Sequence, residues 1–367
     1  MLRSLLKGKA SNPEESLRES EVCIIMPMFN SEKYLEDSIR SILDQDISDW
    51  NLILIDDGSI DQTVKIAESF AEKHENITLI TGHQQKGPSK LRNIGIQKCR
   101  SEFIAFLDSD DMMSPNSLSS RIAAIKSDPL AIGSYSPVSL IDPNGLKLDL
   151  NGTKKEIVNF CDLAGNLFIT SCILVRANQI KKLGGFDTNL LYGEDWDLWL
   201  RLTRLGYYIK CAPQSHIQYR QHPQSHSHSN LHRDFKAREA VSKIAWMRDK
   251  RCPDVPLYFR EGMGPASRAM ANTQRAFTTY ISCIFIGNED EGLKILNDVN
   301  PLLLSLSDPQ TLASASRFAI LRNAVAPASE WSELLKNKRE FVEERSRLHC
   351  SDSLKPFLDK YLSKLFS

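Results

Sequence analysis

At 367 residues the chain is long enough for two domains, and with 41% hydrophobic and 25% charged residues it has the composition of an ordinary globular protein. Lys plus Arg and Asp plus Glu both total 46, and this zero net charge argues against a nucleic-acid partner, because such proteins carry a basic excess. No apolar run approaches the roughly 20 residues that cross a bilayer, and eight scattered cysteines without a CxxC pair indicate buried free thiols in a reducing cytosol.

Residues 1–20 are expected to form a flexible N-terminal segment. Residues 1–9 are basic and apolar but lack the cleavage site of a signal peptide, and residues 10–20 are polar. Arg3, Lys7 and Lys9 would permit peripheral contact with anionic lipid at the inner face of a membrane, although a frayed terminus is the preferred interpretation. The protein is therefore expected to be cytoplasmic.

From residue 21 onward, short apolar runs alternate with segments of helical periodicity. The expected strands are Val22–Met26, Leu52–Ile55, Ile77–Ile80 and Phe103–Leu107. The expected helices begin at a Ser31 cap, at a capping box of Ser59 and Gln62, at Pro88 (ending at Cys99), and at a Ser114 cap followed by Pro115. This alternation predicts an α/β fold with a mostly parallel, Rossmann-like sheet covered on both faces.

The rhythm changes after about residue 130. Asp142-Pro143-Asn144-Gly145 is a turn signal between Ala131–Leu140 and Leu146–Leu150, which predicts a hairpin. A strand around Cys172–Val175, a short helix over Arg176–Leu183, a helix that opens with Glu194-Asp195 and a last strand over Tyr207–Cys211 follow. The chain beyond residue 235 is predicted to be helical, which gives a flexible segment 1–20, a nucleotide-binding domain 21–235 and a smaller helical region 236–367.

Asp108-Ser109-Asp110 is the most informative triplet because it directly follows an apolar strand. Ligands of parallel α/β sheets sit beyond the carboxyl ends of the strands. Two carboxylates at i and i+2 around a tight loop can approach one divalent ion, and hard oxygen ligands suit Mg²⁺ or Mn²⁺. The alternative is a solvated acidic loop.

Two further motifs are candidates for nucleotide binding. Asp56 and Asp57 also follow a strand, and their carboxylates can accept from a base N–H or a ribose hydroxyl, although Asp-Gly-Ser is also ordinary turn chemistry. Arg92 lies on the helix that begins at Pro88, where a guanidinium can meet a diphosphate. A surface ion pair is the alternative for Arg92.

Acidic and histidine side chains mark the second half of the site. Glu194 and Asp195 open a helix, where a carboxylate can take a proton from an acceptor hydroxyl or simply cap the helix. Five histidines crowd a polar segment that runs from His216 to His232, and one of them could complete the metal site. A zinc site is disfavoured because no cysteine ligands accompany them.

Together these residues resemble glycosyltransferase family 2, the inverting family with the GT-A fold. The resemblance rests on an ordered set of motifs over residues 21–228: Met26-Pro27-Met28-Phe29-Asn30, Ile55-Asp56-Asp57-Gly58-Ser59, Leu91-Arg92-Asn93-Ile94-Gly95, Phe106-Leu107-Asp108-Ser109-Asp110-Asp111, Gly185-Phe186-Asp187, Glu194-Asp195-Trp196-Asp197-Leu198 and Tyr219-Arg220-Gln221-His222. Phe29 stands where the family often has tyrosine, and Leu91 replaces a commoner small residue.

The resemblance implies a role for each matched residue. The base and ribose of a nucleotide-sugar, most simply a UDP-sugar, would be held by Pro27, Phe29, Asn30, Asp56 and Asp57, with Arg92, Asp108 and Ser109 nearby. Asp108, Asp110 and His222 would bind Mn²⁺ or Mg²⁺. Asp195 would be the general base and Glu194 its neighbour that orients the acceptor, a glycan or lipid-linked saccharide.

Two other interpretations remain open at the level of the sequence. A nucleotidyltransferase shares a similar domain but would have a glycine-rich basic loop after the first strand, where this chain has Pro27-Met28-Phe29-Asn30. A non-catalytic binding or scaffold protein of the same fold is the second, and loss of Asp110 or Asp195 would favour it; both are present.

Overall fold

The computed structural model describes residues 19–82, 86–165, 169, 172–222, 239–262, 264–310, 312–313, 315–316, 320, 328–350 and 352–366. Several expectations concern residues outside these ranges. They are the flexibility of residues 1–18, the lipid contact of Arg3, Lys7 and Lys9, the domain boundary at residue 235, and the histidines at 226, 228 and 232.

The core of the molecule is an eight-stranded sheet in the order β3-β2-β1-β4-β10-β6-β11-β9. Strands β3, β2, β1 and β4 are mutually parallel, and β10 runs antiparallel to both of its neighbours. The strands are β1 Val22–Met28, β2 Trp50–Asp56, β3 Ile77–Ile80, β4 Phe103–Phe106, β6 Ala131–Tyr135, β9 Ile157–Val158, β10 Ile173–Arg176 and β11 Tyr208–Cys211. The predicted α/β fold with a mainly parallel sheet is therefore confirmed.

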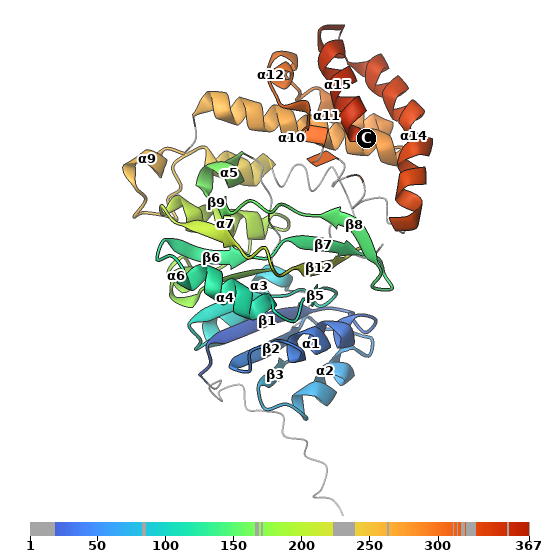
Figure 1. Ribbon diagram of the computed structural model, residues 1–367. Helices are drawn as coiled ribbons and strands as arrows, with labels where there is room; N and C mark the ends of the chain where they lie inside the picture. The colour runs from blue at the N-terminus through green and yellow to red at the C-terminus, as the bar shows by residue number, and fades with distance from the viewer. Residues whose placement is uncertain are drawn as a thin grey trace, which may run out of the picture.

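Helices cover both faces of this sheet because both faces of its central strands are apolar (Figure 1). Alternate residues of β1 separate into two cores: Cys23 and Ile25 pack on one side, Ile24 and Met26 on the other. The first side is covered by α3 (Pro88–Lys98), α6 (Ala177–Lys182) and α7 (Glu194–Arg204), and the second by α1 (Leu35–Leu43), α2 (Thr63–Ala71) and α4 (Ser117–Lys126).

A smaller sheet in the order β5-β12-β7-β8 lies beside the first. Its strands are β5 Met112–Met113, β7 Val138–Ile141, β8 Lys147–Asn151 and β12 Ile217–Arg220. The predicted hairpin is β7–β8, closed by Asp142, whose carboxylate accepts from the backbone of Asn144 and Leu146 at 2.8 Å each. The expected single strand Ala131–Leu140 is divided into β6 and β7, and Tyr207–Cys211 is not the last strand because β12 follows it.

The remaining described elements are helices. They are α5 Phe160–Ala164, α9 Leu257–Arg260, α10 Pro265–Ile286, α11 Glu289–Leu296, α12 Pro301–Ser305, α14 Ala328–His349, the 3₁₀ turn Asp352–Leu354 and α15 Lys355–Leu365, and residues 239–245 are also helical. Figure 1 shows α10, α11, α12, α14 and α15 stacked over β7 and β8, at the end of the molecule opposite β3. Val138, Leu140 and Leu148 of the small sheet share a core with Phe277, Tyr280 and Tyr361 of these helices, so the helical region is packed onto the α/β part.

Three predicted helix caps are wrong. The hydroxyl of Ser31 meets Ser109 instead of capping α1, the hydroxyl of Ser59 accepts from the backbone N–H of Asn30 instead of closing a capping box, and α4 begins at Ser117, three residues after Ser114. These hydroxyls bond to distant loops because the tertiary fold offers partners that the local sequence does not show. None of the described helices is both long and apolar enough to cross a membrane.

Candidate active site

The carboxyl ends of β1, β2 and β4 lie at one edge of the large sheet. Met28 at the end of β1 pairs with Asp56 at the end of β2, and the backbone N–H of Leu107 after β4 donates to Ile25 of β1 at 3.3 Å. Because the three strands are parallel, the loops that follow them converge at this edge. The motifs predicted to bind the nucleotide therefore meet in space.

The β2 loop is held by backbone N–H groups of its own residues and of the segment before α3. One oxygen of Asp56 accepts from the N–H groups of Gly58 and Ser59 at 2.9 and 3.1 Å, and Asp57 accepts from those of Lys86 and Gly87 at 2.7 and 2.8 Å. The second Asp56 oxygen, in a side chain only 3% exposed, has no hydrogen-bond partner among the described residues. Buried polar atoms are almost always paired, so this oxygen is available for a ligand N–H.

The β1 loop carries the other residues predicted to hold the base. Asn30 has a φ of 48°, the left-handed region that asparagine tolerates better than most residues. Its side-chain oxygen accepts from the N–H of Ile60 at 3.0 Å, which joins the β1 and β2 loops. Phe29 is 48% exposed beside them, and Pro27 lies within β1 opposite Ile55. Phe29 thus offers a ring to solvent, whereas Pro27 is part of the sheet.

The β4 loop places its three polar residues in different settings. Asp108 and Asp110 keep 30% of their side chains exposed, while Ser109 is buried against the hydroxyl of Ser31 at 2.7 Å. The Nε2 atom of His222 lies 3.0 Å from Asp110 Oδ2, and its Nδ1 atom is buried without a described partner. The two accessible carboxylates are hard oxygen ligands of the kind that suits Mn²⁺ or Mg²⁺. Asp110 and His222 lie together, but among the described residues the group of ligand atoms within 4.8 Å of one another contains Asp108 without either of them.

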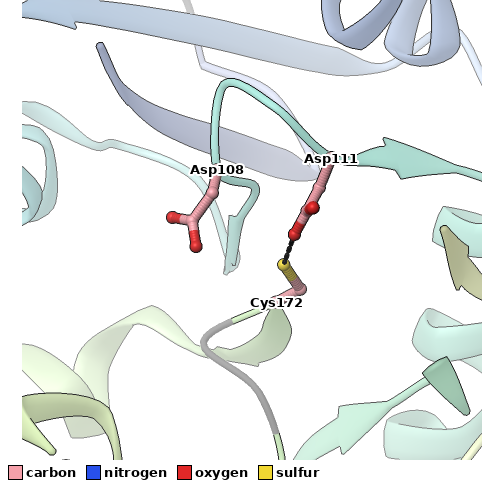
Figure 2. A group of neighbouring side chains, drawn as sticks. All are labelled: Asp108, Asp111 and Cys172. Atoms are coloured by element: carbon pink, nitrogen blue, oxygen red, sulfur yellow. Dashed lines mark hydrogen bonds between the residues drawn. The ribbon is translucent and has the colours of Figure 1, made fainter. Parts of the chain in front are cut away.

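Asp111 completes a tight cluster with Asp108 and Cys172, in which one ligand atom from each lies within 4.8 Å of the others. Figure 2 shows that the Asp111 carboxylate points to the thiol of Cys172, and its other oxygen accepts from the backbone N–H of Arg220 at 2.9 Å. Burial, with the charges of Asp111 and Asp108, raises the pKa of the Cys172 thiol well above its usual value. A protonated thiol is a poor ligand for a hard cation, so we interpret Asp111 and Cys172 as support for the loop.

Arg92 connects the two halves of the site. Its guanidinium donates to Asp108 at 2.6 Å through one nitrogen and to Glu194 at 2.9 Å through another, and its side chain is only 4% exposed. Burial alone would lower the pKa of Arg92, but the carboxylates of Asp108 and Glu194 reverse this and hold the pKa above its ordinary value. The end of β4 and the start of α7 are therefore joined by a buried charged contact.

Glu194 and Asp195 lie in the first turn of α7, after Gly193 in the left-handed conformation. The loop before them is held by Asn93, which neighbours Arg92 on α3. The side chain of Asn93 bonds both backbone groups of Phe186, at 2.8 and 2.9 Å, and the ring of Phe186 lies 5.4 Å from the Arg92 guanidinium. Asn93 thus fixes the approach to α7, a role that the sequence pattern did not reveal.

Arg251 is a second residue that sequence reasoning missed. It forms ion pairs with Asp187, Asp197 and Asp249 at 2.7 to 2.9 Å, although it comes from the region beyond residue 238. In the sequence it belongs to Arg248-Asp249-Lys250-Arg251, a charged run that is typical of a solvated surface. No local signal distinguishes it.

Comparison with known proteins is consistent with this geometry. The model of the family "Glycosyl transferase family 2" matches residues 23–183. An uncharacterized glycosyltransferase of Haemophilus influenzae is 35% identical over 164 residues, which cover 44% of this chain and 64% of that protein. The Escherichia coli protein WfgD, named as a UDP-Glc:α-D-GlcNAc-diphosphoundecaprenol β-1,3-glucosyltransferase, is 30% identical over 183 residues, which cover 50% of this chain and 70% of that protein.

One solved structure extends the similarity beyond the sequence match. S. aureus TarS 1–349, in complex with UDP-GlcNAc, superposes with a TM-score of 0.58 at 17% identity and covers 85% of this chain and 92% of that one. Such coverage reaches into the helices beyond residue 235. The chain spans just under two thirds of the length of the H. influenzae relative. The family match at residues 23–183 lies within the α/β part.

Proposed function

The chain belongs to glycosyltransferase family 2, and from this membership we propose that it is an inverting enzyme that moves a sugar from a UDP-sugar to a hydroxyl of a glycan or lipid-linked acceptor. The observation that carries the proposal is the contact of Arg92 with both Asp108 and Glu194, because it brings a donor motif and a catalytic motif to one point. UDP is favoured as the nucleotide because TarS is bound to UDP-GlcNAc and WfgD is named for UDP-Glc.

The donor would bind at the loops after β1 and β2. The unpartnered Asp56 oxygen would accept an N–H of the base, and the half-exposed ring of Phe29 would pack against it. Asp57 and Asn30 shape these loops through backbone contacts, so their contribution would be to preorganise the pocket.

Asp108, Asp110 and His222 would hold Mn²⁺ or Mg²⁺. When bound, the ion would neutralise charge on the departing diphosphate, which is the usual contribution of a divalent cation to such a transfer. Arg92, beside Asp108, would add a fixed positive charge at the same place.

The chemical step would be a single displacement. Asp195 would take the proton of the acceptor hydroxyl while that oxygen bonds to the anomeric carbon, and the bond from this carbon to the diphosphate oxygen would break on the opposite face. Glu194, held by Arg92, would orient the acceptor hydroxyl toward Asp195. An α-linked donor would then yield a β-linked product.

The reaction is proposed to take place at the cytoplasmic face of a membrane, where a lipid-linked acceptor would be reached peripherally. Support for this comes from WfgD, whose printed acceptor is a diphosphoundecaprenol conjugate. The nature of the donor sugar and of the linkage is left to experiment.

The test is nucleotide release from UDP-, GDP- and dTDP-sugars with Mn²⁺ or Mg²⁺, compared between wild type, Asp110→Ala and the exposed control Asp44→Ala. We expect metal-dependent release from a UDP-sugar that Asp44→Ala retains and Asp110→Ala loses by about 100-fold or more. If no donor is cleaved and no nucleotide with metal raises the melting temperature, the catalytic proposal fails and the scaffold alternative takes its place.

A further inference from the structure

The start of α7 is anchored on both sides of its catalytic residues by one arginine. Arg251 Nη1 lies 2.9 Å from Asp187, before the helix, and Arg251 Nη2 lies 2.7 Å from Asp197, within it. Glu194 and Asp195 lie between these two anchors in the chain. Arg251 also pairs with Asp249 at 2.8 Å. One guanidinium thus joins three carboxylates in a single network.

A second arginine strengthens the same segment from within α7. Asp197 is only 2% exposed, and its other oxygen meets Arg201 at 2.8 Å. Arg201 in turn donates to the carbonyl oxygens of Leu183 and Gly185 at 3.1 and 2.8 Å. Removal of Arg251 would therefore leave a buried carboxylate with one cationic partner and release Asp187.

Further contacts between α7 and the chain beyond residue 238 show that Arg251 is not isolated. Arg204, at the end of α7, donates to the carbonyl oxygens of Ile244, Met247 and Phe259. The guanidinium of Arg275 on α10 lies 5.4 Å from the ring centroid of Trp196, the residue after Asp195. Residues from beyond position 238 thus pack against α7, and both they and α7 lie outside the family match at residues 23–183.

We propose that Arg251 is a positioning residue for Glu194 and Asp195, and that residues 239–262 thereby complete the acceptor side of the active site. The expected effect of Arg251 on the rate of sugar transfer rests on the proposed function. Its physical basis is that a general base acts only within hydrogen-bond reach of the proton it takes, and a displacement of about 1 Å can cost about 100-fold in rate. Arg251 does not touch the reacting atoms.

The first measurement needs no substrate. Hydrogen–deuterium exchange of full-length wild type, Arg251→Gln and Arg251→Lys is followed in peptides that cover residues 187–197 and 55–60. We expect faster exchange at 187–197 in both variants and unchanged exchange at 55–60, while the exposed control Arg248→Gln behaves as wild type. Unchanged protection at 187–197 would overturn the proposal, even if the protein proved to have no transferase activity.

The second measurement uses the donor found by nucleotide release. Arg251→Gln is expected to lower kcat by about 10- to 100-fold while the KM for the donor changes less than about twofold. Because one third of the Arg251 side chain is exposed, added guanidinium at tens of millimolar should restore part of the loss. A purely structural role would instead lower folded protein, raise the donor KM and show no rescue.

Arg251→Lys keeps the positive charge without the forked geometry, so it is the variant to rely on if Arg251→Gln does not fold. We expect a kcat between those of wild type and Arg251→Gln. Wild-type kcat in both variants, with normal exchange at 187–197, would exclude the positioning role.

Discussion

The proposed donor half and the proposed acceptor half of the site are built in different ways. Around the proposed donor loops, Asp57, Asn30 and one oxygen of Asp56 accept hydrogen bonds from backbone N–H groups of the same or neighbouring loops. On the acceptor side, α7 is held by side chains that come from α3 and from beyond residue 238, namely Asn93 and Arg251. Backbone-supported loops follow from strand order, whereas the side-chain anchors depend on how distant segments pack.

This difference predicts how substitutions should behave. A change in the acceptor half should alter the catalytic step and leave nucleotide binding intact, and a change at the junction should alter both. Three sets of substitutions and one pH series test whether the two halves respond separately.

Asp195→Asn should be the most damaging for catalysis. Loss of the proposed general base is expected to lower kcat about 10³-fold. The thermal shift with UDP and Mn²⁺ should stay as in wild type, because the loops after β1 and β2 that are proposed to hold the nucleotide are unchanged. The exposed Asp44→Asn serves as control. Activity within about tenfold of wild type would assign the base to another residue.

Arg92→Lys should affect both halves together. A single ammonium group cannot reproduce the two separate contacts to Asp108 and Glu194. We expect kcat/KM to fall about 100-fold, with weaker binding of UDP in the presence of metal, whereas Arg100→Lys near the end of the same helix should have no effect. A loss confined to kcat would place Arg92 in the acceptor half alone.

Gly185→Ala and Gly184→Ala form a matched pair for the Asn93 contact. Both glycines have left-handed backbones, with φ of 74° and 76°, but a Cβ on Gly185 would lie 2.3 Å from Asn93 Oδ1, while one on Gly184 meets nothing within 4 Å. Gly185→Ala should therefore cost about 1–3 kcal/mol more than Gly184→Ala in urea unfolding. Equal losses of stability would mean that backbone strain alone sets the cost of both substitutions and that the Asn93 side chain moves aside without loss.

The pH dependence of stability should report the Arg251 network. Burial raises the pKa of Asp249, but hydrogen bonds from Arg251 lower it more, so the net pKa is below its ordinary value. A depressed folded pKa stabilises the protein above the unfolded pKa, near about 3.9, and this contribution is lost as the pH falls through the folded value.

Urea unfolding from pH 7 downward should therefore show wild type more stable than Arg251→Gln, with a difference that narrows once the pH falls below about 4. Arg248→Gln should follow wild type throughout. A difference that grows on acidification would contradict the sign of this linkage.

Much of the fold could be predicted from the sequence because local patterns determine it. Apolar strands that alternate with helices predicted the mainly parallel sheet. The family suggested by the ordered motifs is confirmed by the match over residues 23–183 together with the similarity to WfgD. The Asp142 turn produced the predicted β7–β8 hairpin. Three helix starts were predicted wrongly because hydroxyls such as those of Ser31 and Ser59 found partners in other loops.

The site residues themselves stay predictions, but the structure shows which of them meet. Asp108 and Glu194 are 86 positions apart in the numbering and are joined by Arg92, and Asp110 meets His222. The arrangement of carboxylates at the carboxyl edge follows from parallel strands, which the sequence already indicates.

The sequence alone therefore indicated the alternation of the first four predicted strands with helices and the position of the acidic loops, since apolar periodicity and turn residues act over a few positions. Only the tertiary structure decided that Asn93 holds Phe186 and that Arg251 joins Asp187 to Asp197. An arginine in a charged run has the same local pattern whether it faces water or pairs with a buried carboxylate. The difference lies in which buried carboxylate the packing brings to it.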